Sequence, residues 1–140
     1  MYERILIPTD GSACSDAAVA QGAKLAKALG SEVTILHALD ALAFTRDGFV
    51  TIAEVERALR ARGEHEIARA IALAAQEGIE ARGVVVDGAP LEEIVRASAA
   101  CDLVVMGSHG LGFVRRMLVG SIAQAVLHHV KRPVLVVPPT

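Results

Sequence analysis

Residues 103–112 read LVVMGSHGLG, an apolar run followed directly by a loop that contains several glycines. A short apolar run bounded by glycine is typical of a buried β-strand. Similar runs lie at 5–7, 33–39 and 134–137, and a more alternating one lies at 81–86. Because most of these runs are apolar at consecutive positions, we expect a parallel sheet with both faces covered by helices.

Helical patterns separate the apolar runs. The first spans about 15–29 and ends at Gly30, a residue favoured after the end of a helix. The third begins at Pro90, and the fourth begins near Gly120-Ser121. The second has the clearest period, while charged residues such as Glu66 and Arg69 fall mainly on its other faces. Its apolar residues, expected to face inward, are Ile52, Val55, Leu59, Ile67, Ala70, Ile71 and Ala74.

The resulting order is βαβαβαβαβ, which predicts an α/β fold. We expect one doubly wound, five-stranded parallel sheet with helices on both faces, a Rossmann-like single domain over residues 1–140. Residues 40–50 have the least regular pattern and are expected to form a connection.

Composition and charge exclude several classes of protein. Hydrophobic residues make up 53% of the chain and charged residues 21%, which excludes intrinsic disorder. A net charge of −2 leaves no broad basic field, so we expect neither nucleic acid nor a membrane as a partner. No apolar run approaches the roughly 18 residues of a membrane span, and the first residues lead into a strand rather than a signal peptide. The expected compartment is the cytoplasm.

The loop after the fourth strand is the strongest candidate for a ligand site, because ligands of open parallel sheets bind beyond the carboxyl ends of the strands. At Gly107, Gly110 and Gly112 the missing side chains would let backbone amides approach an anion. Gly120-Ser121 opens the fourth helix, whose N-terminus favours phosphate. The two clusters together predict a polyphosphate site. The alternative is that these glycines serve only the turns.

These residues carry a resemblance to a known family. The pattern Gly107-x2-Gly110-x9-Gly120-Ser121 resembles the ATP-binding signature of universal stress proteins. The segment ILIPTDGS at 5–12 is similar to that family's first strand and loop, and PVLVV at 133–137 is similar to its last strand. The resemblance covers the whole chain and implies a fold of the universal stress protein type with bound ATP.

The resemblance also implies a set of nucleotide-binding residues. On the floor of the site and beside the ribose these are Pro8, Thr9 and Asp10. Near the adenine they are Ala38, through its backbone, and Met106. Around the ribose and the phosphates they are Gly107, His109, Gly110, Gly120, Ser121 and Ile122. The pattern names no catalytic residue and no protein ligand of a metal.

Several of these residues have a second interpretation. Asp10 either contacts the ribose or caps the first helix and stabilises its own turn. His109 either binds a phosphate or faces water. Arg115 and Arg116 either neutralise the triphosphate or are solvated loop charges. A Mg²⁺ ion on the phosphates would be held mainly by phosphates and water, because only one obvious carboxylate lies nearby.

Three functions therefore compete. We favour an ATP-binding regulatory protein of the stress response. The alternative from the same site is a slow ATPase or a nucleotidyl or phosphoryl transferase, although no clear nucleophile and base accompany the glycines. The third is a scaffold without a ligand. We also expect a homodimer through Pro133–Val137, because this uncharged run is expected at a sheet edge, and the family resemblance implies the same. The alternative is that a loop or the segment 40–50 covers this edge.

Overall fold

The computed structural model describes residues 1–44, 51–111 and 119–139. Its strands are β1 (Arg4–Pro8), β2 (Glu32–Leu39), β3 (Arg82–Asp87), β4 (Leu103–Gly107) and β5 (Val134–Val137). Its helices are α1 (Ala13–Leu29), α2 (Ile52–Gln76), α3 (Pro90–Ser98) and α4 (Ser121–His129), with a short 3₁₀ turn, η1 (Ala41–Phe44), after β2. The strands form one parallel sheet in the order β3-β2-β1-β4-β5. The predicted α/β fold and order of elements are confirmed.

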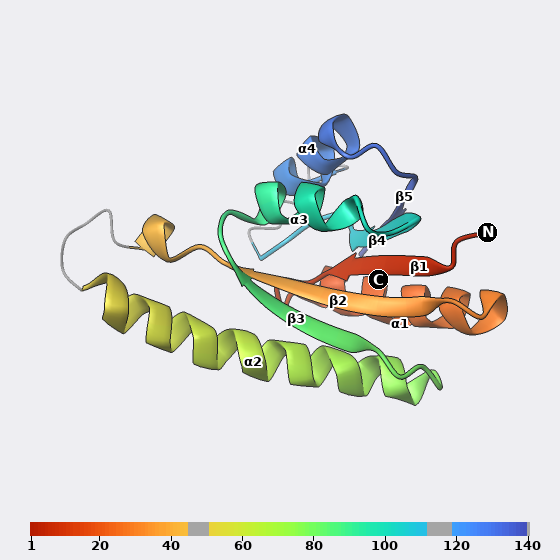
Figure 1. Cartoon of the computed structure of the whole chain (residues 1–140), viewed down its shortest axis with the longest axis horizontal. Coiled ribbons are helices and arrows are strands. Elements are labelled where there is room, and N and C mark those ends of the chain that lie inside the picture. The colour runs from red at the N-terminus through yellow and green to blue at the C-terminus, as the bar shows by residue number, and fades with distance from the viewer. Residues whose placement is uncertain (45–50, 112–118, 140) are drawn as a thin grey trace.

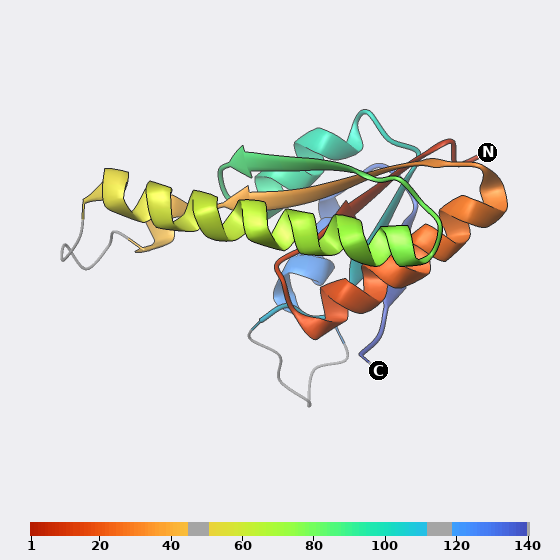
Figure 2. The ribbon, with the colours of Figure 1, turned by 90° about the horizontal axis from the view of Figure 1, so that it is seen from below.

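Each face of the sheet carries its own hydrophobic core. Ile5 and Ile7 of β1 point to the core beneath α1 and α2, whereas Leu6 points to the core beneath α3 and α4. Figure 1 shows α3 and α4 above the sheet, and Figure 2 looks onto α1 and α2, with the sheet behind them. Burial of successive side chains on opposite faces explains why the strand sequences are continuously apolar.

Helix α1 packs close to the central strands because a glycine faces them. A Cβ atom at Gly22 would lie 2.5 Å from Cδ1 of Ile7 and 3.5 Å from Cγ1 of Val105. The helix begins at Ala13, earlier than expected, because the hydroxyl of Ser12 accepts a hydrogen bond from the amide of Ser15 and caps it. It ends at Gly30, whose φ of 70° is left-handed.

Helix α2 differs from expectation in its first half. Ile67, Ala70 and Ala74 are buried as predicted, but Ile52 is 47% exposed and Val55 is only half-buried. The helix has 25 residues and is therefore about 37 Å long, longer than the strands it covers, and its first turns extend beyond the sheet (Figures 1 and 2). The apolar repeat of α2 therefore continues into turns that lie beyond the hydrophobic core.

In the described ranges, no helix has both the length and the apolar composition that a bilayer crossing requires.

The order of the strands creates a switch point between β1 and β4. From β1 the chain proceeds to β2 and β3 on one side, and from β4 it proceeds to β5 on the other. The loops that leave the carboxyl ends of β1 and β4 therefore diverge, and such a divergence is where open α/β sheets hold ligands. The last strand, β5, lies at an edge of the sheet, as the sequence predicts.

Substituting valine for Gly22 tests the close contact between α1 and the sheet. We expect Gly22→Val to lower the free energy of unfolding by about 1–3 kcal/mol, because the added methyl groups would displace Ile7. Gln21→Val, at an exposed position of the same helix, is the control and should change it by less than about 0.5 kcal/mol. Urea denaturation measures both. Equal stabilities for the two variants would show that the contact is looser than described.

Candidate functional site

A cleft of about 340 Å³ lies at the carboxyl ends of β1 and β4. The loops after these strands form its floor, and the first turns of α3 and α4 form its walls. Every residue of the nucleotide-binding set that the resemblance implies lines it. From β1 and β2 these are Pro8, Thr9, Asp10 and Ala38. From β4, its loop and α4 they are Met106, Gly107, His109, Gly110, Gly120, Ser121 and Ile122.

Asp10 joins the two loops of the floor. Its Oδ1 accepts a hydrogen bond of 2.9 Å from the amide of Ser12, which stabilises the turn after β1. Its Oδ2 accepts one of 3.0 Å from the amide of Leu111, in the loop after β4. Asp10 therefore stabilises its own turn, as one interpretation predicted, but the cap of α1 is Ser12 and not Asp10.

The glycines of the β4 loop are in close contact with the rest of the protein. A Cβ at Gly107 would lie 2.8 Å from the carbonyl carbon of Cys14, and one at Gly110 would lie 2.5 Å from Oδ2 of Asp10. A Cβ at Gly120 would lie 3.1 Å from the carbonyl oxygen of Ser108. None of these three has a positive φ, so close approach rather than left-handed backbone is the reason for glycine. Gly112 lies outside the described residues.

The first turn of α4 provides hydrogen-bond donors to the cleft. Gly120 is the N-cap, and no side chain caps the helix there. The amide of Gly120 donates to the carbonyl of Ser108 at 2.6 Å, which positions this turn beside the β4 loop. The next amides, of Ser121, Ile122 and Ala123, have no partner within the helix, and these residues line the cleft. The helix dipole gives this end a partial positive charge.

His109 does not face water, so that interpretation is wrong. The residue is 7% exposed, and its Nδ1 shares a hydrogen bond of 2.8 Å with the hydroxyl of Ser108. The buried residue forms part of the wall of the cleft.

Arg115 and Arg116, the other charged candidates of this loop, lie outside the described residues. Within the described lining Asp10 is the only carboxylate, and no lysine or arginine is present.

Apolar side chains form another part of the cleft lining. Leu36 and Ala38 come from β2, Met106 from β4, and Pro90 and Ile94 from α3. Sequence reasoning missed Leu36, Pro90 and Ile94, because their apolar character predicted only core packing. The available signal was positional: α3 begins right after β3, so its first turn necessarily borders the carboxyl edge of the sheet. Sequence reasoning also missed Ser15, Ser108, Leu111 and Ala123.

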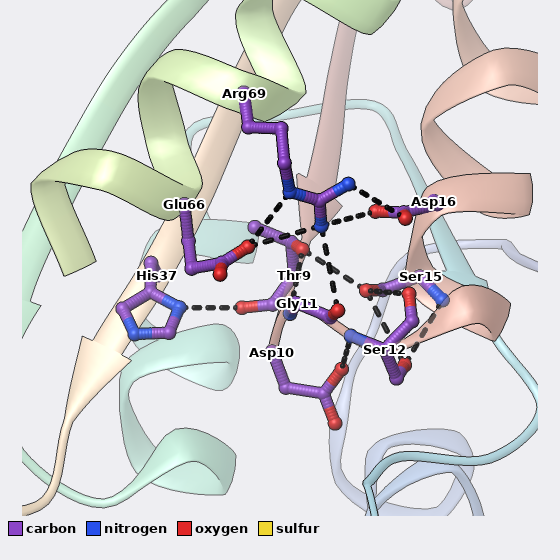
Figure 3. A network of polar contacts seen from close by, with 9 residues as sticks. All are labelled: Thr9, Asp10, Gly11, Ser12, Ser15, Asp16, His37, Glu66 and Arg69. Atoms are coloured by element: carbon purple, nitrogen blue, oxygen red, sulfur yellow. Dashed lines mark hydrogen bonds and ion pairs between the residues drawn. The ribbon is translucent and has the colours of Figure 1, made fainter. Parts of the chain in front are cut away.

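A polar network supports the floor from the side of α2 (Figure 3). The guanidinium of Arg69 donates to both carboxylate oxygens of Asp16 at 2.8 Å and to Oε2 of Glu66 at 3.0 and 3.1 Å. It also donates to the carbonyl of Gly11 at 3.3 Å. These hydrogen bonds, led by those to Asp16, raise the pKa of Arg69 above its usual value, although partial burial opposes the shift.

This network was not predicted. Glu66 and Arg69 were assigned to the faces of the second helix that do not pack, yet they point to the loop after β1. His37 of β2 donates from Nδ1 to the carbonyl of Thr9 at 2.9 Å, a contact that was not predicted either. The one available sign was the spacing of Glu66 and Arg69, which allows an ion pair on a helix surface.

The fold and the cleft can be compared with known proteins. The model of the universal stress protein family matches residues 1–138. Universal stress protein MJ0531 of Methanocaldococcus jannaschii is 31% identical over 98% of this chain and 82% of that protein. The solved structure of MJ0577, from the same organism, has a TM-score of 0.86 at 30% identity and covers 100% of this chain and 98% of that one. A universal stress protein solved in complex with cAMP has a TM-score of 0.76 at 25% identity, covering 99% and 98% of the two chains. The match extends over nearly all of the sequence, and the chain belongs to the universal stress protein family.

Proposed function

We propose that the cleft binds an adenine nucleotide, with ATP as the ligand, and that the protein is a regulator in the stress response. One observation carries the proposal. Segments distant in the sequence converge on a single cleft whose lining combines an apolar slot with the uncapped N-terminus of α4. A flat base and a phosphate chain need these two kinds of environment. The relative solved with cAMP supports the choice of an adenine nucleotide.

The proposed pose follows the chemistry of the walls. The adenine lies in the apolar slot, where Met106 packs against it and the backbone of Ala38 meets its edge. The ribose lies beside Asp10, on the floor formed by Pro8 and Thr9. The phosphates lie toward the amides of Ser121 and Ile122, where unpaired N–H groups and the helix dipole favour negative charge. His109, Gly107, Gly110 and Gly120 surround the ribose and the phosphates in this pose.

A regulator fits the described lining better than an enzyme does. Phosphoryl transfer needs a positioned base and cationic groups around the phosphates. Asp10 is the only carboxylate of the described lining, and both of its oxygens already accept amide hydrogen bonds. For the same reason Mg²⁺ would be held by the phosphates and water rather than by the protein.

We also propose a homodimer that pairs through Pro133–Val137. Strand β5 is an edge strand of four residues, and Leu135 is 42% exposed. An uncharged edge with free backbone groups favours pairing with a second strand, and a symmetric dimer provides that strand from an identical chain. The alternative cover is not favoured: η1 lies near the start of α2, far from β5 in both views of the fold (Figures 1 and 2), and residues 45–50 lie outside the described part.

Binding of ATP is the direct test of the proposed function. We expect a dissociation constant in the micromolar range, about −8 kcal/mol, because amides and a helix dipole rather than cations hold the phosphates. At a hundredfold excess of ATP over that constant, the protein should gain about 2.7 kcal/mol of stability. Isothermal titration and thermal melting of nucleotide-free protein measure the two effects. A melting temperature that millimolar ATP leaves unchanged would exclude the proposal.

Substitutions in the loops should locate the phosphates. Gly110→Val would displace the carboxylate of Asp10, and Gly120→Val would press against the carbonyl of Ser108, so both should abolish binding. Ser121→Ala should cost about 0.5–1.5 kcal/mol of binding free energy, the value of one neutral hydrogen bond. Isothermal titration compares them with His128→Ala, at the exposed far end of α4, which should bind as the wild type does. Valine variants that bind normally would place the ligand elsewhere.

A lysine at Leu135 should separate the proposed dimer. Leu135 is exposed, whereas Val137 is 7% exposed and belongs to the core beneath α1 and α2. Leu135→Lys should therefore yield a folded monomer, because two like charges would meet across the pairing. Val137→Lys is the contrasting variant and should instead destabilise the fold. Sedimentation of the wild type at high micromolar concentration gives the decisive value: a mass near 14.6 kDa would refute the dimer.

A further inference from the structure

The loop between β1 and α1 is held at two carbonyl groups from outside the cleft (Figure 3). The carbonyl of Thr9 accepts a hydrogen bond from His37 of β2, and that of Gly11 accepts one from Arg69 of α2. Asp10 lies between these two anchored residues and directs its carboxylate to Ser12 and Leu111. The backbone on each side of Asp10 is thus held by a different element of the fold.

Arg69 is the group that connects these elements. Its guanidinium binds Asp16 of α1, Glu66 of α2 and the carbonyl of Gly11 at the same time. A planar guanidinium with several fixed donors makes these contacts together, and an ammonium group does not reproduce that geometry. The side chains are partly screened from solvent, with exposed fractions of 36% for Arg69, 30% for Asp16 and 17% for Glu66.

Gly11 packs closely against the ion pair of Glu66 and Arg69. It has a φ of +82°, and a Cβ at this position would lie 2.8 Å from Oε2 of Glu66. The same carboxylate oxygen accepts hydrogen bonds from Nε and Nη2 of Arg69. The backbone of Gly11 is therefore packed against an ion pair of α2, one residue away from Asp10 in the cleft.

We infer that Arg69 is a positioning residue of the nucleotide site. It does not line the cleft, yet it holds the backbone of Gly11 and thereby sets where the carboxylate of Asp10 lies. The inference rests on the proposed function, because it assigns Arg69 a role in the affinity of that site. Removal of the guanidinium leaves the turn after β1 without its anchor on α2, so we expect Gly11 and the carboxylate of Asp10 to lose their single arrangement, while Thr9 stays held by His37.

Arg69→Met tests the inference, and Arg60→Met is its matched control. Arg60 is also on α2 and donates to both carboxylate oxygens of Asp87 at 2.8 Å, but this ion pair does not touch the loop after β1. Isothermal titration with ATP should show a dissociation constant raised roughly 3- to 30-fold in Arg69→Met. In Arg60→Met it should stay within about twofold of the wild type, as expected for distant, independent sites.

A second measurement separates positioning from general stability. The amide of Gly11 donates to Oγ1 of Thr9, and that of Ser12 donates to Asp10. Hydrogen exchange at these two amides should be faster in Arg69→Met than in the wild type, whereas the amides of β1 and β4 should exchange as before. Saturating ATP should slow the exchange of both amides again. A purely structural role would instead accelerate exchange throughout the sheet.

The outcomes distinguish the two proposals. If the wild type does not bind ATP, the proposed function and this inference both fail. If the wild type binds ATP and Arg69→Met binds it equally well, only the role of Arg69 is overturned. Should Arg69→Met not fold, Arg69→Lys carries the comparison, because it keeps the charge beside Asp16 and Glu66 without the planar fork. Wild-type affinity together with wild-type exchange in Arg69→Lys would then overturn the inference.

Discussion

The carboxylate of Asp10 is the contact on which the geometry of the cleft depends. It accepts one amide from its own turn and one from the loop after β4, and so joins the two loops that diverge at the switch point. The contact requires that residue 110 lack a side chain, because a Cβ there would lie 2.5 Å from Oδ2 of Asp10. The turn after β1 also supplies the cap of α1, so one short segment sets both the floor of the cleft and the start of a helix.

The glycines of the β4 loop show why a ligand signature is difficult to read from sequence. Gly107 makes room for the start of α1, Gly110 for a carboxylate, and Gly120 for the carbonyl of Ser108. Each glycine therefore has a reason within the protein itself. Glycine is expected at these positions if an anion must approach the backbone. It is equally expected if the protein's own packing needs the space. Only the position of the uncapped α4 amides in the cleft wall adds an argument specific to an anion.

Most of the fold could be predicted because its signals are local. Ile5, Leu6 and Ile7 are buried on alternate faces, and Gly30 and Pro90 mark helix ends by their own backbone preferences. Element bounds differ from expectation by a few residues at most. The exposed first half of α2 could not be predicted, since an apolar period carries no information about where the sheet beneath the helix ends.

Most of the cleft lining could also be placed, because strand ends follow from the strands. The contacts of His109 and Arg69 could not. One interpretation had His109 facing water, but this loop residue is buried against its neighbour Ser108. Arg69 is separated by 53 residues from Asp16, and nothing in either segment indicates that the two meet. Contacts between polar side chains on separate helices depend on how those helices pack over the sheet, which local patterns do not specify.

The proposed roles of Asp10 and Arg69 are linked by thermodynamic reciprocity. If the hydrogen bond from Arg69 to Gly11 improves nucleotide binding, bound nucleotide must strengthen the attachment of the loop to α2 by the same free energy. A ligand that spans the cleft also contacts the first turn of α4, on the opposite side of the sheet from α2. In the proposed pose the nucleotide therefore connects helices from both layers through the turn after β1. A small molecule bound at one end of the sheet would in this way restrain α1, α2 and α4 together, which is the property that a nucleotide-dependent regulator needs.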